Sequence, residues 1–244
     1  MMRYCFQEAQ REGYPLLLTT TTRLLKVARG PEAITGESGR IHIGPGIGPK
    51  LPLLWVGGDT AEGRKWYGPP MEALEAVLRA SRNSSRENPR RTVLIEADGS
   101  AGRPVKAPGS GEPVIPPQVD TVAALLGLSA LGRRVSRKTV HRLEYYLALS
   151  GCSPGDIITP ELLCSLIVHQ KGSFKGTLPG MRRLLILNQA DSPEDLHLAE
   201  KIILLVQNMK MKSSESTDIF PETIVVSSFH PLHKINPIRS IASI

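Results

Sequence analysis

The sequence predicts an α/β protein built on a doubly wound, mostly parallel sheet, and three observations support that prediction. Short apolar runs without polar alternation recur along the chain, as in strands that are covered on both faces. Segments with helical spacing or helix caps separate these runs, which favours alternating strands and helices. The 244 residues, of which 41% are hydrophobic, are sufficient for one large domain or two small ones.

Six segments are expected to be strands because each is rich in apolar or β-branched residues and ends in polar or glycine residues. They are residues 15–22, 51–56, 92–97, 120–127, 183–188 and 222–227. Helical spacing or capping residues predict helices over residues 1–13, 70–82, 159–169 and 192–211. We therefore expect a single α/β domain over residues 1–230, followed by a loosely packed tail over residues 231–244.

Composition indicates the cellular compartment of the chain and the classes of partner that it binds. No apolar run approaches the roughly 18 residues that a membrane span needs, and the first residues do not form a secretory signal. A cytoplasmic protein without a membrane partner is expected. The net charge of +7 favours an anionic partner, but an aromatic content of 5% argues against a nucleic-acid partner. The three cysteines have no metal-ligand spacing.

The segment 99–120 differs from the rest of the chain because it is rich in proline and glycine and has little periodicity. It follows the strand end at Asp98, and α/β proteins place ligands at such strand ends. Loops of this length within a compact domain are usually functional or disordered. We therefore expect a functional loop at this edge of the sheet.

The run from Val93 to Gly99 looks like a Walker B strand, in which an apolar strand brings a carboxylate to the edge of the sheet. Asp98 would then hold Mg²⁺ through water. The simpler alternative is an ordinary strand that ends in an Asp-Gly turn. Threonines 19–22 would supply a hydroxyl to Mg²⁺ or a phosphate, although β-propensity and local capping explain them equally well.

Residues 184–191, with the sequence LLILNQAD, resemble the guanine-reading loop of GTP-binding proteins, in which Asn and Asp follow a strand. Such an aspartate accepts both N–H groups on the edge of guanine. Gln189 stands where those proteins have lysine, which weakens the guanine interpretation. The alternative is a strand that leads into a helix cap at Ser192.

No Gly-x-x-x-x-Gly-Lys-Ser/Thr phosphate loop accompanies these motifs. The nearest match runs from Gly44 to Lys50, but its prolines remove amide donors, so residues 40–52 are expected to be a connection. In a P-loop fold, a strand and the phosphate loop precede the helix expected over residues 1–13. We therefore expect that strand and loop to be missing from the chain. Either the natural protein begins further upstream, or the chain is a degenerate relative.

These features together resemble the YqeC family, whose members are described as accessory factors for selenium-dependent molybdenum hydroxylases. The most specific stretch is IEADGSAGRPVKAPGSGEPVIPP at residues 95–117. The same pattern includes, in order, the threonines 19–22, VHR at 140–142, KG at 175–176 and LNQAD at 187–191. The resemblance implies a P-loop NTPase-like α/β fold that acts in the maturation of a molybdenum hydroxylase.

The resemblance also implies roles for individual residues. Glu96 and Asp98 would be the catalytic carboxylates, with Asp98 as the Mg²⁺ ligand. The nucleotide, GTP or ATP, would be bound by Thr20, Thr21, Asn188 and Asp191. The candidates for binding a phosphate, a selenide or a cofactor anion are Arg103, Lys106, His141, Arg142 and Lys175.

Several of these basic residues also have a purely structural interpretation. Arg103 and Lys106 fit solvated loop charges equally well. His141 is expected on an amphipathic helix over residues 140–147, where a partly buried histidine is common. Lys175 lies between two glycines, in a segment expected to be mobile.

Three alternative functions are consistent with the sequence. The first is a maturation factor for a molybdenum hydroxylase that acts as a Mg²⁺-nucleotide-dependent switch or NTPase, provided that the natural protein carries the phosphate loop. The second is a non-hydrolysing adaptor or chaperone that presents the 99–120 loop to the apo-hydroxylase. The third is a nucleotidyltransferase that acts on the molybdenum cofactor.

Overall fold

The computed structural model describes residues 2–25, 33–35, 53–82, 92–213, 219–228 and 238–243. The chain divides into two compact units. The first unit comprises residues 1–99 and 114–119, and the second comprises residues 100–113 and 120–244. The proline-rich loop therefore contributes to both units. The connection expected over residues 40–52 lies outside the described residues.

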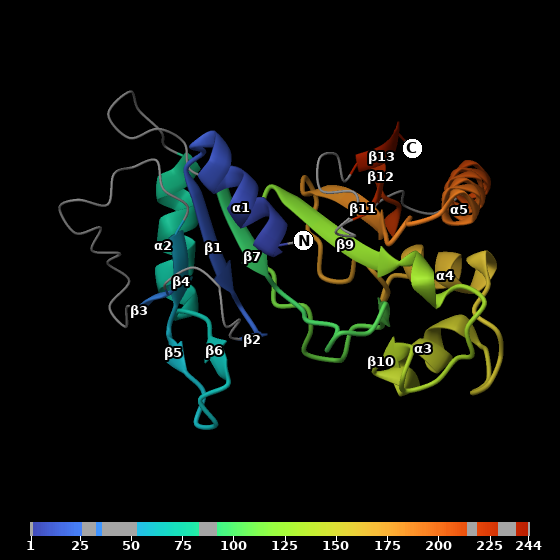
Figure 1. Ribbon diagram of the computed structural model, residues 1–244, viewed down its shortest axis with the longest axis horizontal. Coiled ribbons are helices and arrows are strands. Elements are labelled where there is room, and N and C mark those ends of the chain that lie inside the picture. The colour runs from blue at the N-terminus through green and yellow to red at the C-terminus, as the bar shows by residue number, and fades with distance from the viewer. Residues whose placement is uncertain are drawn as a thin grey trace. The chain divides into compact units, whose positions relative to one another are not determined.

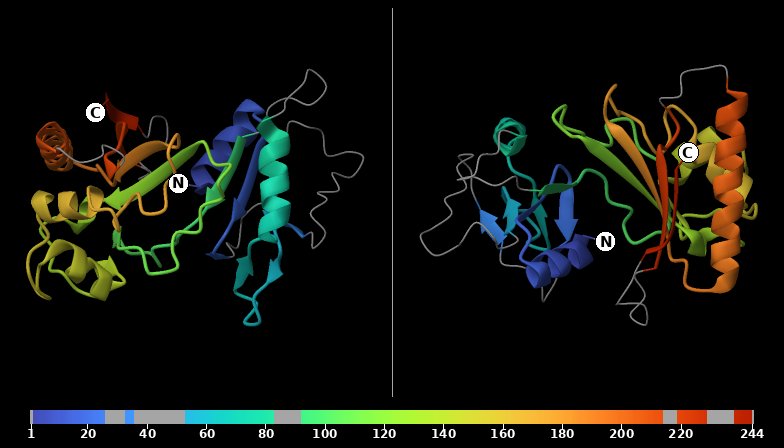
Figure 2. Two further views of the ribbon diagram at one scale, coloured as in Figure 1. Left: turned by 180° about the vertical axis from the view of Figure 1, so that it is seen from behind. Right: turned by 90° about the horizontal axis from the view of Figure 1, so that it is seen from above.

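The first unit is a parallel sheet with a helix on each face (Figures 1 and 2). Its strands are β1 (Leu16–Thr20), β3 (Ala33–Thr35), β4 (Leu53–Val56) and β7 (Thr92–Glu96), in the order β3-β4-β1-β7. The helices are α1 (Met2–Glu12) and α2 (Met71–Arg82), which lie on opposite sides of this sheet in Figure 2. This arrangement explains why the sequence of β1 is apolar without alternation.

Side chains of β1 alternate between the two helices, as strand geometry requires. Leu16 and Leu18 pack with Ala9 of α1, whereas Leu17 packs with Leu74 of α2. All of these side chains are buried. Each face of the strand is therefore closed by its own apolar cluster.

A small antiparallel sheet completes the first unit. It consists of β2 (Arg23–Leu25), β5 (Gly58–Asp59) and β6 (Lys65–Tyr67). Gly68, directly after β6, lies against the backbone of β1. A Cβ atom at this position would lie 1.8 Å from the carbonyl oxygen of Thr20, so only glycine fits without a backbone shift.

The second unit contains a four-stranded sheet in the order β13-β12-β11-β9. Its strands are β9 (Thr121–Gly127), β11 (Arg182–Asn188), β12 (Thr223–Ser227) and β13 (Ile238–Ser243). The first three are parallel, and β13 is antiparallel to β12. A second, two-stranded sheet pairs β8 (Val105–Lys106) with β10 (Val140–His141).

Helical segments of the second unit are η1 (Leu128–Ala130), α3 (Leu143–Ser150), α4 (Pro160–Ile167) and α5 (Pro193–Lys212). The side chains of α4 and α5 pack with the sheet in one apolar core, and Figure 2 shows α5 running alongside the strands. Thr159 caps α4, and Ser192 caps α5 with Asp195 in a reciprocal capping box. Both helix starts confirm the expected cap residues.

The α/β class, the six expected strands and the four expected helices are confirmed, with small differences in their bounds. The expectation of one continuous sheet was wrong, because the long parallel strands of the described ranges fall into two sheets. Residues 238–243 of the expected loose tail form β13. No helix in the described part of the chain is both long enough and apolar enough to cross a membrane.

Candidate anion-binding site

A two-residue strand pair brings distant basic residues together in the second unit. β8 and β10 are parallel, with Val105 opposite Val140 and Lys106 opposite His141. The helix expected over residues 140–147 was wrong in its first turn, since His141 lies in β10 and α3 begins at Leu143. A left-handed backbone at Arg142, with φ of 58°, turns the chain from strand to helix.

Glu112 lies between two of the predicted anion-binding residues. Its Oε2 accepts a hydrogen bond of 2.8 Å from Lys106 Nζ, and its Oε1 accepts one of 2.6 Å from Arg142 Nη2. The Lys106 side chain is only 10% exposed. Burial favours a higher pKa for Glu112, but the hydrogen bonds and charges of Lys106 and Arg142 outweigh it and lower the pKa below 4.5. Glu112 is therefore ionised at neutral pH.

Arg103 contacts β10 and the turn that precedes it. Its Nε donates to the carbonyl oxygen of Arg137, and its Nη1 lies 3.2 Å from Nδ1 of His141. Burial, followed by the charges of Lys106, Arg103 and Arg142, lowers the pKa of His141 below 6.5. The imidazole is therefore neutral at pH 7. Because a guanidinium only donates, Nδ1 accepts this hydrogen bond and the ring proton is assigned to Nε2.

Lys175 connects a third segment of the chain to the same place. Its Nζ donates to the carbonyl oxygens of Gly109 and Ser110, the latter at 2.9 Å. Gly109 also lies against the guanidinium of Arg142. A Cβ atom at residue 109 would lie 2.8 Å from Nη1 and 3.0 Å from Cζ of that side chain. Glycine at this position therefore lets the loop and the arginine approach closely.

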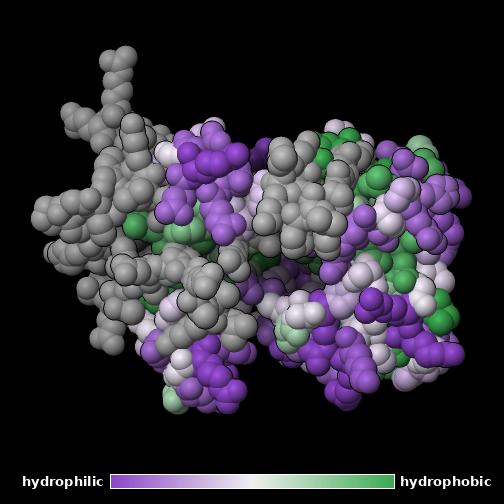
Figure 3. All heavy atoms as spheres, in the orientation of Figure 1, coloured by the Kyte–Doolittle hydropathy of each residue, from purple (hydrophilic) through white to green (hydrophobic). Residues whose placement is uncertain are grey.

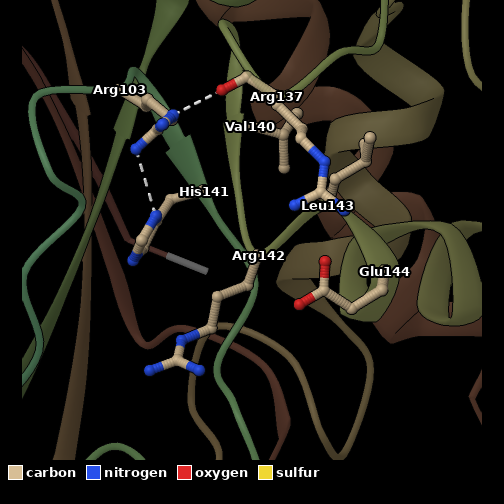
Figure 4. A pocket seen from close by; sticks show the side chains of 7 residues that line it. All are labelled: Arg103, Arg137, Val140, His141, Arg142, Leu143 and Glu144. Carbon is tan, nitrogen blue, oxygen red and sulfur yellow. Dashed lines mark hydrogen bonds between the residues drawn. The ribbon is translucent and has the colours of Figure 1, made fainter.

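A hollow of about 360 Å³ lies at the junction of β10 and α3 (Figure 4). Its lining residues are Arg103, Arg137, Val140, His141, Arg142, Leu143 and Glu144. In Figure 4 the His141 ring lies between the guanidinium groups of Arg103 and Arg142. The surface over β10 and α3 is mainly hydrophilic (Figure 3). With three guanidinium groups and one carboxylate, the hollow has the charge and hydrogen-bond donors of an anion site.

The predicted carboxylates and threonines lie in the first unit, at the carboxyl ends of β1 and β7. Thr20 lies opposite Glu96 in the parallel register, and its hydroxyl donates to the Glu96 carbonyl oxygen at 2.8 Å. The Thr21 hydroxyl donates to the carbonyl oxygen of Val114 at 2.8 Å. Asp98 follows β7 by two residues. The threonine hydroxyls thus stabilise the backbone at this edge.

The donors at this edge suit Mg²⁺ in kind, because carboxylate and hydroxyl oxygens are the hard ligands that this ion prefers. Mg²⁺ usually takes one or two protein carboxylates and completes its shell with water and phosphate oxygens. Glu96 and Asp98 supply two carboxylates. Among the residues with a described position, no group of three His, Cys, Asp or Glu side chains could hold a metal ion.

The predicted base-reading residues lie at the ends of β11 and β12 in the second unit. The Ser227 hydroxyl donates to Asn188 Oδ1 at 3.3 Å, and the Ser228 hydroxyl donates to Asp191 Oδ1 at 2.5 Å. Ser192 caps the helix that follows, as the alternative interpretation of this segment expects. Asn188 and Asp191 therefore belong to a polar strand edge with two serine partners.

The structure thus brings all five basic candidates together in the second unit, namely Arg103, Lys106, His141, Arg142 and Lys175. The first unit contains Thr20, Thr21, Glu96 and Asp98, whereas the second unit contains Asn188 and Asp191. Sequence reasoning missed Arg137, Gly109 and Glu112. A signal for Glu112 was present, since it is the one acidic residue between Asp98 and Asp120.

Comparisons with known proteins concern mainly the first part of the chain. A family model described as "YqeC protein" matches residues 1–144, which include Glu112 and Arg142. A curated protein of Escherichia coli (strain K12), named "Uncharacterized protein YqeC", is 31% identical over 137 residues. This match covers 56% of the chain and 54% of the relative, so the chain spans about half the relative's length. No solved structure matches the chain.

Proposed function

The chain belongs to the YqeC family, and on this premise we propose that it is an accessory factor for the maturation of a molybdenum hydroxylase that carries selenium. In this proposal the protein binds an anionic group of the hydroxylase cofactor or of its precursor. The binding site is the basic cluster, defined as Arg103, Lys106, His141, Arg142 and Lys175. The family resemblance supports the role in hydroxylase maturation, and the convergence of the five basic residues supports this choice of site.

The single observation that carries the proposal is the convergence of these residues from three distant segments. Residues 103–106, 141–142 and 175 meet around the loop 107–113. Gathering like charges costs free energy unless an anion offsets it. Glu112 offsets part of this charge through Lys106 and Arg142. Arg103 of the cluster and the neighbouring Arg137 line the hollow, where an anionic ligand would be bound by charge-assisted hydrogen bonds.

A second candidate function is a Mg²⁺-nucleotide-dependent switch or NTPase with a P-loop NTPase-like fold. It is favoured by the neighbouring parallel strands β1 and β7, which end in threonines and carboxylates at one edge. Asp98 would hold Mg²⁺ with Glu96 as the second catalytic carboxylate, and the ion when bound would neutralise charge on the nucleotide phosphates. Thr20 and Thr21 would bind the nucleotide beside it.

The test of the first proposal is a maturation assay with site variants. A selenium-dependent molybdenum hydroxylase is produced in cells that contain the wild-type chain, the double variant Arg103→Ala/Lys175→Ala, or no chain. The specific activity of the purified hydroxylase should fall about tenfold or more with the double variant, because two of the cations are lost. Lys138→Ala is the matched control, since this lysine is exposed and does not line the hollow.

Equal hydroxylase activity with and without the chain would overturn the maturation role. A requirement for the chain that the double variant still satisfies would overturn the basic cluster as the working site. That second result would favour the adaptor, which needs the protein surface but not the anion site. Thermal unfolding of each variant verifies that it is folded.

A further inference from the structure

Arg142 has hydrogen-bond donors that its contact with Glu112 does not use. Its Nη2 donates to Glu112 at 2.6 Å. Its Nε is buried and has no hydrogen-bond partner in the described structure. Nε and Nη2 form one edge of the guanidinium, and this edge is the part that binds two oxygens of a carboxylate or phosphate at once. The carboxylate of Glu112 therefore satisfies only half of a bidentate site.

The Glu112 carboxylate binds two cations, each through one oxygen, and so makes no bidentate contact with either. Its other oxygen accepts from Lys106 at 2.8 Å. A carboxylate with one negative charge thus bridges two positive groups, with Arg103 and Arg137 lining the adjoining hollow. A dianion with several oxygens would satisfy more donors at the same position. The geometry is that of an anion site occupied by a weaker, internal anion.

We propose that Glu112 is an internal competitor for a phosphate group, which displaces its carboxylate from Arg142 and Lys106 when the ligand binds. The inference rests on the proposed function, because it concerns the same basic cluster. It narrows the ligand class to a tetrahedral oxyanion, either inorganic phosphate or a phosphate monoester. A selenide has no set of oxygens with which to bind the Nε–Nη2 edge.

Displacement of Glu112 also changes the loop that carries it. Residues 107–113 are attached through three kinds of contact: Glu112 to the two cations, Lys175 to two carbonyl oxygens, and Ala107 N–H to the His141 carbonyl oxygen at 3.3 Å. Loss of the Glu112 contact removes the attachment at the far end of this segment. Ligand binding in the hollow is thereby coupled to release of residues 111–113, which include the exposed Gly111, whereas Lys175 still holds the carbonyl oxygen of Ser110.

The proposal is tested by titration of the full chain with inorganic phosphate and with guanosine monophosphate, for the wild type and Glu112→Gln. Glutamine keeps the size of the side chain and removes its charge. Because the competitor is weakened, the apparent Kd of Glu112→Gln should be lower by about tenfold or more. Glu144→Gln is the matched control. Glu144 lines the same hollow but makes no ion pair in the part of the chain that the structure describes.

Hydrogen exchange of the amides of Gly111 and Glu112 gives a second readout, since the Glu112 N–H donates to the Gly109 carbonyl oxygen at 3.3 Å in the unliganded loop. Phosphate should accelerate their exchange in the wild type, whereas a ligand that occupied a preformed site beside Glu112 would slow it. In Glu144→Gln, the affinity for phosphate should rise less than in Glu112→Gln. Phosphate should still accelerate the exchange of these amides in Glu144→Gln. If only inorganic phosphate binds, the natural ligand is free phosphate. If guanosine monophosphate binds at least as tightly as inorganic phosphate, the natural ligand is a phosphate monoester.

Failure of this inference and failure of the proposed function give different results. If the wild type binds phosphate and Glu112→Gln binds it equally well or more weakly, Glu112 is not a competitor, while the basic cluster remains an anion site. If neither protein binds phosphate or the monoester, the competitor role is overturned. The maturation assay then decides independently whether the cluster serves the hydroxylase.

Discussion

Glu112 and Arg142 are joined by a hydrogen bond of 2.6 Å although thirty residues separate them in the chain. The contact connects the proline-rich loop to the junction between β10 and α3. Arg142 has a left-handed backbone there, and Gly109 lies against its guanidinium. Arg142 therefore both attaches the loop through Glu112 and lines the hollow.

Gly109→Ala is expected to weaken anion binding with little loss of stability. The new Cβ atom would lie 2.8 Å from Arg142 Nη1, so the guanidinium must move away from the loop. The end of a flexible side chain can shift at low cost, and the free energy of unfolding should change by less than about 1 kcal/mol. The affinity for phosphate, measured by calorimetric titration, should fall about tenfold because the arginine no longer has its binding geometry.

Gly111→Ala is the control for that change, because a Cβ atom at residue 111 meets nothing within 4 Å. It alters the same loop and the same residue type without touching Arg142. Equal effects of the two substitutions would show that loop flexibility, and not the approach to Arg142, governs binding.

Binding of sulfate is expected to strengthen as the pH falls from about 7.5 to about 5.5. The pKa of His141 is below 6.5 in the empty site, and a bound dianion raises it, so binding is accompanied by proton uptake. The cations that face this imidazole are Lys106, Arg103 and Arg142, and the carboxylate that faces it is Glu112. Glu112 stays ionised because its pKa is below 4.5. Sulfate is a suitable probe since it remains a dianion throughout.

His141→Gln should remove this pH dependence, whereas His197→Gln, at an exposed position of α5, should retain it. The lowered pKa of His141 also predicts the direction of the stability change in the empty protein. The unfolded chain takes up the proton more readily, so the contribution of His141 to stability is lost as the pH falls below 6.5. A pH slope that persists in His141→Gln would assign the titration to another group.

Arg183→Ala is expected to destabilise the second unit by about 2–4 kcal/mol in urea unfolding. Arg183 is 8% exposed, and its guanidinium donates to the carbonyl oxygens of Phe220 and Met181 and to Glu222. Removing it leaves these acceptors without their donor. Arg182→Ala, at the exposed neighbouring position, should change stability by less than about 0.5 kcal/mol. Similar losses for both variants would contradict the assigned role of Arg183.

Asp191→Asn is expected to weaken GTP binding more than ATP binding, by about 1–3 kcal/mol, if this strand edge reads guanine. The fold should be unchanged, because an asparagine oxygen can still accept from the Ser228 hydroxyl. Glu194→Gln, at an exposed position in the first turn of α5, is the control for the loss of one nearby charge. Equal weakening of the two nucleotides would leave only the structural interpretation of this segment.

Part of the candidate site could be predicted from the sequence. The five basic residues were identified through their positions in a family pattern, and the structure brings them together. Glu112 was missed because its partners, Lys106 and Arg142, belong to β8 and to the β10–α3 junction. The pairing of such short strands leaves no periodic pattern in a sequence. His141 was placed on a helix because apolar residues from 140 onward have helical spacing, although the helix begins only after Arg142.

Local signals in the sequence are sufficient to predict the long strands and most helices of this protein. Apolar runs predict β1, β7 and β11, and the capping residues Thr159 and Ser192 predict where α4 and α5 begin, because these signals depend on contacts between residues close in the chain. The two separate sheets, and the position of Glu112 between Lys106 and Arg142, are seen only in the three-dimensional structure. Strand order and ion pairing depend on which distant segments meet, and local patterns carry no information about that choice.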